Sequence, residues 1–234
     1  MAIALLTIVC VVLIVSAMVP VLGPSDSSDE GASLKRGNGS VEYYWTYARH
    51  PYTLQMDIPY EDYAKYLNDD VRRNRFTESQ ALNLCQTFVT SQDATIVYIS
   101  SAINDMARER GLTQQGTIDL ALAFVQSIEY ASDEATAGHD EYWRYPVETL
   151  YEGAGDCEDK SFLFASIIEA MGYDAVILAF DDHMAVGVAC PGASGAYYSM
   201  DGSKYFYCET TSSDDWELGR APEEYTTAHV VRVE

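Results

Sequence analysis

The second half of the chain is an ordered series of one helix-forming segment and several strand-forming segments. Residues 158–171 are predicted to be helical, and Gly172 follows them as a typical left-handed stop. The strand-forming segments that come next are residues 174–180, 183–190, 196–200 and 205–209. Asp201 and Gly202 separate the last two segments and favour a type I′ turn, so these segments are predicted to form a hairpin.

The region upstream predicts mainly helices. One helix is predicted from Asp93, its candidate cap, to about Arg110, with Gly111 as the stop signal. A second helix is predicted over residues 113–130, where Thr113 is the candidate cap. Helices that come before an antiparallel sheet are typical of an α+β fold.

The chain is very acidic, with 36 Asp and Glu against 14 Lys and Arg among 234 residues, and a formal net charge of −22 at pH 7. Such a charge repels phosphate backbones, which argues against binding to nucleic acid. A surface so rich in acids and poor in lysine resembles the halophilic proteins of salt-loving organisms, where high ionic strength screens the self-repulsion. The alternative is an acidic protein without that adaptation.

The N-terminal residues 1–23 contain no charged side chain and are long enough to span a hydrocarbon core of about 30 Å. No Lys or Arg precedes this run and no small-residue cleavage pattern closes it, which favours a transmembrane anchor over a cleaved signal sequence. Residues 24–40 are rich in Ser, Gly and Asp and are predicted to be a flexible linker. Residues 41–234 read as one domain with a core at about residues 113–211. We therefore expect a single-pass protein of the cell membrane whose domain lies outside the cytoplasm.

Cys157 lies in the segment Gly-Asp-Cys-Glu-Asp at the predicted start of a helix. A helix N-terminus offers unpaired backbone N–H groups and the positive end of the helix dipole, and both favour a thiolate. We therefore expect the pKa of Cys157 to lie below the ordinary thiol value, although three adjacent carboxyl groups oppose this. The same N–H groups can hold an oxyanion when a thiolate attacks a carbonyl. Cys157 is thus the candidate nucleophile, with a buried structural thiol as the alternative.

His183 is the candidate base, at the start of the second predicted strand. Alternate residues of a strand share a face, so His183 lies with Ala185, Gly187 and Ala189. Because these neighbours are small, we expect the Cys157 helix to pack on this face and to bring its N-terminus near the imidazole. The alternative is a histidine that belongs to the core.

Glu209 is the candidate third residue. If its strand pairs antiparallel with the strand that begins at His183, residue numbers across the ladder sum to about 392, and Glu209 lies beside His183. A carboxylate there can accept the second imidazole N–H, fix the tautomer and stabilise the imidazolium. Asp201 is the alternative, but it lies in the turn at the far end of the hairpin.

The cysteines of the chain show no CxxC spacing, so a structural zinc site is not expected. Those outside the candidate site are Cys10, Cys85, Cys190 and Cys208. The predicted register separates Cys190 from Cys208 by on the order of 20 Å along the ladder. A disulfide requires Cα atoms within about 7 Å, so both are predicted to be free, buried thiols. No metal ion or other cofactor is indicated.

Taken together, these residues resemble the transglutaminase-like superfamily, in particular its microbial cysteine-peptidase-like members. The resemblance covers about residues 117–211 and is carried by Pro146 to Leu150, Gly155 to Asp159, Gly172-Tyr173, His183 and Glu209 to Thr211. It implies a papain-like α+β core with a Cys-His-Asp arrangement in that chain order, and hence Cys157 as nucleophile, His183 as base and Glu209 as third member. Glu209 departs from the usual aspartate. Some relatives bind calcium near the nucleophile, but Ala154 and Gly155 lack the additional upstream acid, so a calcium site is not expected.

The expected function is hydrolysis of an amide bond in a protein or peptide substrate, through an acyl-enzyme at Cys157. Two alternatives stay open. One is amide transfer, in which an amine rather than water resolves the same thioester. The other is a catalytically silent cell-surface interaction domain, against which the intact set of Cys157, His183 and Glu209 argues. Gln126 and Trp143 are further candidates, either as oxyanion donors or as packing residues.

Overall fold

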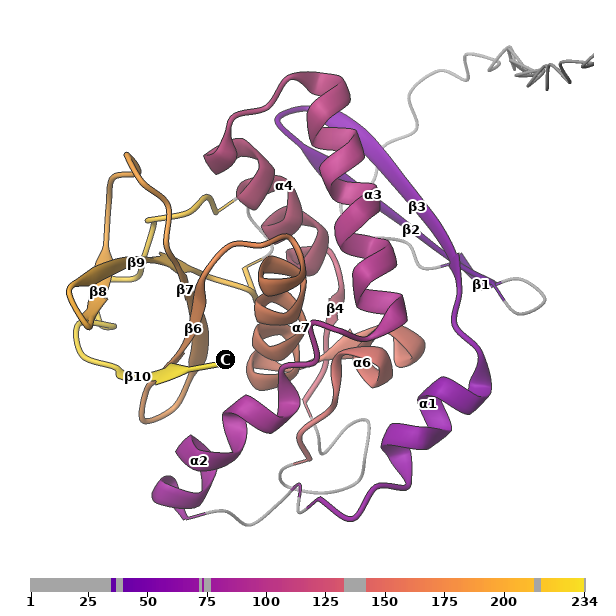
Figure 1. Ribbon diagram of the computed structural model, residues 1–234, viewed down its shortest axis with the longest axis horizontal. Coiled ribbons are helices and arrows are strands. Elements are labelled where there is room, and N and C mark those ends of the chain that lie inside the picture. Colours follow the sequence, from indigo (N-terminus) through magenta and orange to yellow (C-terminus); the bar gives the residue numbers. More distant parts are fainter. Residues whose placement is uncertain are drawn as a thin grey trace, which may run out of the picture.

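A computed structural model describes residues 35–36, 40–71, 73, 77–132, 142–212 and 216–233, and it shows a mixed α+β fold (Figure 1). The helices are α1 (Tyr60–Leu67), α2 (Glu78–Phe88), α3 (Ala94–Arg110), α4 (Gln114–Gln126), α6 (Pro146–Glu152) and α7 (Cys157–Ala170). The predicted anchor, residues 1–23, and most of the predicted linker, residues 24–40, lie outside the described residues. Within the described ranges, no helix combines the length and apolar character needed to cross a membrane.

The described strands form an N-terminal antiparallel sheet, a short parallel pair and a C-terminal antiparallel sheet. The first has the order β1 (Lys35–Arg36), β2 (Ser40–Tyr47), β3 (His50–Asp57), and the parallel pair is β4 (Glu129–Tyr130) with β5 (Ala154–Gly155). The last has the order β10 (His229–Arg232), β6 (Ala175–Ala179), β7 (Met184–Val188), β9 (Ser203–Cys208), β8 (Tyr197–Met200). It curls round on itself (Figure 1). The predicted order of helices before an antiparallel sheet is therefore confirmed.

Helix α7 lies at the centre of the molecule. It contacts α3, α4 and α6 on one side and strands β6 and β7 on the other (Figure 1). Its sequence explains this position, because apolar side chains occur all round the helix rather than along one stripe, which is typical of a fully buried helix. The buried apolar residues of α7 are Phe162, Leu163, Phe164, Ala165, Ile167 and Ile168. The first turn of α7 is therefore held between the helical layer and the sheet.

The two helices predicted upstream begin as expected, but one of them ends early. Asp93 caps α3 by accepting a hydrogen bond from the backbone N–H of Thr95, and Gly111 ends it with a φ of 64°. Helix α4 begins after Thr113 as expected but ends at Gln126, and the last residues of the predicted helix form β4. In β4, Tyr130 pairs with Gly155, which brings the end of α4 beside the segment that contains Cys157.

The face of β7 that meets α7 is the opposite of the predicted one. Met184, Val186 and Val188 join the main core together with the apolar residues of α7. Ala185 lies on the other face, inside the curl of the sheet, in a cluster with Tyr205 and Tyr207. The small side chains of β7 thus make room for tyrosine rings rather than for the helix.

Gly187 shows how closely that second face is packed. A Cβ atom at this position would lie 2.8 Å from Cβ of Tyr205 and 2.9 Å from Cγ2 of Val176. We expect Gly187→Ala to lower the free energy of unfolding by about 1–3 kcal/mol through overpacking. Chemical denaturation measures this, with Gly116→Ala in α4 as the control because its Cβ would meet ordinary contacts of 3.4 Å or more. Equal stability of the two variants would contradict the packing described here.

The hairpin of β8 and β9 turns at Asp201 and Gly202, whose φ angles of 51° and 83° are those of the predicted type I′ turn. The register between β7 and β9 differs by two residues from the prediction, because Val186 lies opposite Cys208. A shift of two residues leaves every side chain on its original face. Glu209 therefore still lies on the side of the sheet to which His183 belongs.

Candidate active site

The segment that precedes α7 determines where the helix begins. The side chain of Asp156 caps α7 by accepting a hydrogen bond from the backbone N–H of Asp159, and Cys157 is the first helical residue. Gly155 has no space for a side chain, since a Cβ there would lie 2.8 Å from Cβ of Asp159 and 3.1 Å from Cγ2 of Thr149. The cysteine is therefore fixed at the N-terminus of α7, as predicted.

Asp159 anchors the first turn of α7 to the segment before α6. Its Oδ2 accepts from Nη1 of Arg144 and its Oδ1 from the backbone N–H of Arg144, both at 2.7 Å. Nε of Arg144 also donates to Oε2 of Glu152 at 2.8 Å. The side chains of Arg144 and Asp159 are 1% and 0% exposed, so this is a buried ion pair. The sequence gives no signal for it, because the two residues belong to segments that only the fold brings together.

The Cys157 thiol is held as a neutral group. Burial raises the pKa of Cys157 well above its ordinary value, and the charge of Glu158 raises it further. The thiol donates a hydrogen bond to Oε2 of Glu158 at 2.8 Å. A hydrogen bond from the backbone N–H of Met184 to the sulfur acts in the opposite direction. The predicted fall in the pKa of this thiol is therefore wrong for the resting site, because burial and the adjacent carboxylate outweigh the helix N-terminus.

Glu158→Gln is expected to make Cys157 react at lower pH. The substitution removes the negative charge next to the sulfur, and removal of such a charge should lower the thiol pKa by about one to three units. Alkylation by iodoacetamide, followed across pH by peptide mass spectrometry, measures this change. Glu61→Gln in the exposed first turn of α1 is the control. An unchanged pH profile in Glu158→Gln would show that the carboxylate does not hold the thiol neutral.

His183 and Glu209 form a hydrogen-bonded pair at the ends of two interior strands of the curled sheet, just before β7 and just after β9. Nε2 of His183 lies 3.0 Å from Oε2 of Glu209, and the side chains are 10% and 7% exposed. Oε2 of Glu209 also accepts from the Tyr207 hydroxyl at 2.6 Å, and Oε1 accepts from the backbone N–H and hydroxyl of Thr211. The pairing predicted from strand parity is therefore present.

The hydrogen bonds of Glu209 keep it ionised. Burial alone would raise its pKa, but the hydrogen bond and charge of His183, together with the hydroxyls of Thr211 and Tyr207, lower the pKa to about 2. A carboxylate with these partners can orient the imidazole and stabilise its protonated form. Asp201, the alternative third residue, instead pairs with Arg232 at 2.7 Å in the β8–β9 turn.

The sulfur of Cys157 lies beside the strand that carries His183. His183 immediately precedes β7, and its carbonyl accepts from the backbone N–H of Phe180 at 2.9 Å to close the β6–β7 turn. The next residue, Met184, donates its N–H to the sulfur. The structure thus brings Cys157 to the end of the strand where His183 and Glu209 meet.

Tyr225 is a site residue that sequence reasoning missed. Its ring stacks on the imidazole of His183, with ring centres 4.9 Å apart and planes inclined by 16°. The ring also contacts Phe180, and its backbone carbonyl accepts from the hydroxyl of Tyr198. No periodic pattern surrounds Tyr225, which lies between β9 and β10 in an irregular segment, so only the fold places it at the site.

Gln126 and Trp143, the two further candidates, make structural contacts in this fold. Nε2 of Gln126 donates to the backbone carbonyls of Glu209 at 2.8 Å and Trp216 at 2.9 Å, which supports the chain after β9. The buried amine of Lys160 in turn donates to the backbone carbonyls of Gln126 and Ile128, at 3.3 and 2.8 Å, where α4 ends. Burial lowers the pKa of Lys160 to about 8, against the opposing effect of the Glu209 charge. The ring of Trp143 packs edge-on against Phe88 and Phe162.

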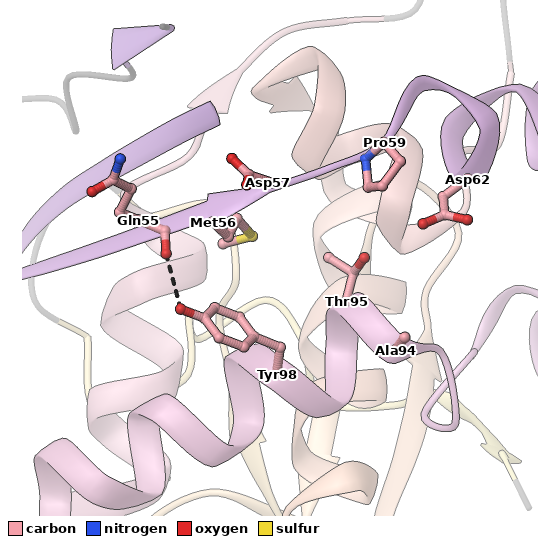
Figure 2. A pocket seen from close by; sticks show the side chains of 8 residues that line it. All are labelled: Gln55, Met56, Asp57, Pro59, Asp62, Ala94, Thr95 and Tyr98. Atoms are coloured by element: carbon pink, nitrogen blue, oxygen red, sulfur yellow. Dashed lines mark hydrogen bonds between the residues drawn. The ribbon is translucent and has the colours of Figure 1, made fainter. Parts of the chain in front are cut away.

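The other described cysteines and a separate cavity lie outside this site. Cys85, Cys157, Cys190 and Cys208 are free thiols. Cys190 and Cys208 are also buried, so the prediction that these two do not form a disulfide is confirmed. Among the described residues, no cluster of His, Cys, Asp and Glu side chains could hold a metal ion. A cavity of about 560 Å³ lies elsewhere, where β3 leads into α1 beside the start of α3 (Figure 2). Its lining residues are Gln55, Met56, Asp57, Pro59, Asp62, Ala94, Thr95 and Tyr98.

Comparisons with known proteins find weak structural similarity. No protein-family model matches the chain, and no curated protein matches it. LapG of Legionella pneumophila aligns in its EGTA-treated form over 65% of this chain and 82% of LapG, at 17% identity and a TM-score of 0.39. The calcium-bound form aligns over 63% and 81%, with the same identity and TM-score. A structure described as a TGase aligns over 83% of this chain and 47% of its own length, at 15% identity and a TM-score of 0.37. At this level of similarity the site is interpreted from its own residues.

Proposed function

We propose that this protein is a thiol hydrolase that cleaves an amide bond in a protein or peptide through an acyl-enzyme at Cys157. The observation that carries the proposal is the hydrogen-bonded pair of His183 and Glu209 beside a helix N-terminal cysteine whose sulfur accepts from the N–H of Met184. A nucleophile, a base and a group that orients the base are the parts required for thiol catalysis. The resemblance of the sequence to transglutaminase-like cysteine peptidases supports the same assignment.

In the proposed reaction the thiol proton passes to His183 as the sulfur attacks the substrate carbonyl. The tetrahedral oxyanion is stabilised by backbone N–H groups at the positive end of α7. The imidazolium then protonates the departing amine, which leaves a thioester on Cys157. His183 next takes a proton from water as the water oxygen attacks the thioester carbonyl. The tetrahedral intermediate then collapses with cleavage of the C–S bond, and the imidazolium returns its proton to the departing sulfur, which releases the acid and restores the thiol. Glu209 remains a carboxylate throughout, in keeping with its pKa of about 2.

The neutral resting thiol is compatible with this reaction. Cys157 donates to Glu158 before substrate binds, so the thiol must turn from Glu158 to His183 when the carbonyl arrives. Expulsion of water by the substrate strengthens the interaction between the thiolate and the imidazolium. Hydrolysis and amide transfer share every step up to the thioester. The difference lies only in whether water or an amine attacks it.

Acetylation by p-nitrophenyl acetate tests the proposal on the full chain in mild detergent. We expect one acetyl group to appear on Cys157, located by peptide mass spectrometry, and not on the buried Cys85. The modification should be absent in Cys157→Ala and at least about tenfold slower in His183→Asn, because general-base assistance contributes at least this much. His50→Asn, on the exposed start of β3, is the control.

Two other outcomes point to the alternatives. Acetylation of Cys157 that does not depend on His183 would contradict the enzyme assignment and favour a silent interaction domain. If glycine ethyl ester accelerates loss of the acetyl group and is itself acetylated, the acceptor is an amine and the enzyme is a transferase. Association with the membrane through residues 1–23 remains part of the proposal. Fractionation of cells that express the full chain and a chain without these residues tests it.

A further inference from the structure

We infer that Ser161 and Thr210 are positioning residues that hold the nucleophile in register with the base and its carboxylate. The inference rests on the proposed function of Cys157, His183 and Glu209. These two buried hydroxyls would act by positioning Cys157, His183 and Glu209, and would not take part in the reaction themselves. The hydroxyls lie where the catalytic helix meets the sheet.

The contacts of Ser161 join the three segments of the site. Its Oγ donates to the backbone carbonyl of Met184 at 3.1 Å and lies 3.2 Å from Oγ1 of Thr210. Met184 is the residue after His183, and Thr210 is the residue after Glu209. Both Ser161 and Thr210 are fully buried. Ser161 of α7 is thus hydrogen-bonded to the residue that follows the base and to the residue that follows the orienting carboxylate.

Ser161 also lies on the same side of α7 as the nucleophile. Residues four apart in a helix are neighbours on one face, so Ser161 is stacked one turn below Cys157. The sulfur of Cys157 accepts from the backbone N–H of Met184, and Ser161 donates to the carbonyl of that same residue. Helix α7 therefore contacts both backbone polar groups of a single residue of β7, its N–H and its C=O.

These hydrogen bonds supply a constraint that apolar packing does not. Contacts between apolar side chains are not directional, so they fix the separation of α7 and β7 better than the position of one along the other. A hydrogen bond is directional and weakens steeply when its geometry changes. Since misplacement of a reacting group by about 1 Å can cost on the order of 10²-fold in rate, small slippage of α7 would affect catalysis.

The direction of each hydrogen bond follows from the donors available. A hydroxyl has one proton, and the Ser161 proton is used on the carbonyl of Met184, so Thr210 donates to Ser161. Thr210→Val keeps the volume of the side chain and removes this donor. Thr210→Ser keeps the donor and removes only a methyl group. The two variants separate the hydrogen bond from the packing.

Ser166 provides a matched control on the same helix. It is also fully buried, donates to the carbonyl of Phe162 at 2.7 Å and accepts from the backbone N–H of Thr90 at 2.9 Å. Its partners lie in α7 and in the loop between α2 and α3, not in the sheet. Ser166→Ala therefore removes a buried serine hydroxyl of α7 without touching the contact between α7 and the site strands.

The test measures acetylation of Cys157 by p-nitrophenyl acetate across pH, together with thermal unfolding of each variant. We expect Ser161→Ala and Thr210→Val to be acetylated about 10- to 100-fold more slowly than the unmodified chain at neutral pH. Their pH profiles should approach that of His183→Asn. Ser166→Ala should lower the unfolding temperature to a similar extent but keep the original rate and pH profile, and Thr210→Ser should restore most of the rate.

The outcomes separate this inference from the proposed function. If Ser161→Ala and Thr210→Val retain the rate and pH profile while His183→Asn loses them, the positioning role is overturned and the proposed function stands. If His183→Asn matches the unmodified chain, the proposed function itself fails and this inference fails with it. Should Ser161→Ala not fold, the comparison of Thr210→Val with Thr210→Ser decides the question alone.

Discussion

Arg144→Met is expected to lower the free energy of unfolding by about 3–5 kcal/mol, because it leaves the buried carboxylate of Asp159 without its cation. Arg144 is almost wholly inaccessible and donates to Asp159 through both its side chain and its backbone. The substitution retains much of the aliphatic volume, so the loss reports mainly the uncompensated charge. Chemical denaturation monitored by circular dichroism measures the change.

The control for this prediction is an ion pair with the same chemistry at the surface. Arg108 pairs with Asp105 at 2.7 Å, and the two side chains are 76% and 54% exposed. Arg108→Met should change the free energy of unfolding by less than about 1 kcal/mol, since water screens exposed pairs. A similar loss in both variants would mean that burial of the Arg144 pair does not determine its contribution.

Glu209→Gln is expected to reduce the steady release of p-nitrophenol from p-nitrophenyl acetate by about 10²- to 10⁴-fold. The amide is neutral, so it cannot stabilise the imidazolium that forms when His183 takes a proton. It can also present an N–H instead of an acceptor to Nε2 of His183, which favours the wrong tautomer. The rate of the Cys157→Ala variant is subtracted as the background.

Asp182→Asn is the matched control, because this exposed carboxylate is adjacent to His183 in sequence and no described hydrogen bond joins the two side chains. A large loss in both variants would indicate a general electrostatic effect rather than a specific partner of His183. The pH dependence of stability should also differ between the unmodified chain and Glu209→Gln. The pKa of Glu209 is about 2 in the fold against an ordinary 4.5, so its ionised form stabilises the fold above pH 4.5. That contribution is lost as the pH falls through about 2 and is missing from Glu209→Gln.

Local signals in the sequence predicted much of the fold. Asp93 and Gly111 mark the ends of α3, and Asp201-Gly202 marks the turn between β8 and β9, because caps and tight turns have specific residue requirements. The turn between β2 and β3 had no such signal. Ala48 and Arg49 occupy it with φ angles of 49° and 65°, which side chains other than glycine adopt only when the surrounding hairpin requires it.

Strand parity was sufficient to predict that His183 and Glu209 lie together. Features of the candidate site that depend on tertiary contacts were not predicted correctly. Parity alone predicted that Glu209 lies on the same face of the sheet as His183. This prediction holds although the predicted register was wrong by two residues. Parity could not tell which face of β7 meets α7, since both faces are buried. The pKa of Cys157 was predicted in the wrong direction because burial and the orientation of Glu158 depend on the whole fold. Tyr225 reaches the site from a segment without local pattern.

The hydrogen bond from Cys157 to Glu158 affects how long the thiol survives under oxidising conditions. Peroxide attacks thiolates far faster than neutral thiols, and the sulfenic acid that results can be oxidised further without return. A cysteine kept protonated until substrate arrives would therefore be spared this damage while idle. We expect inactivation by hydrogen peroxide to be slow in the unmodified chain and faster in Glu158→Gln.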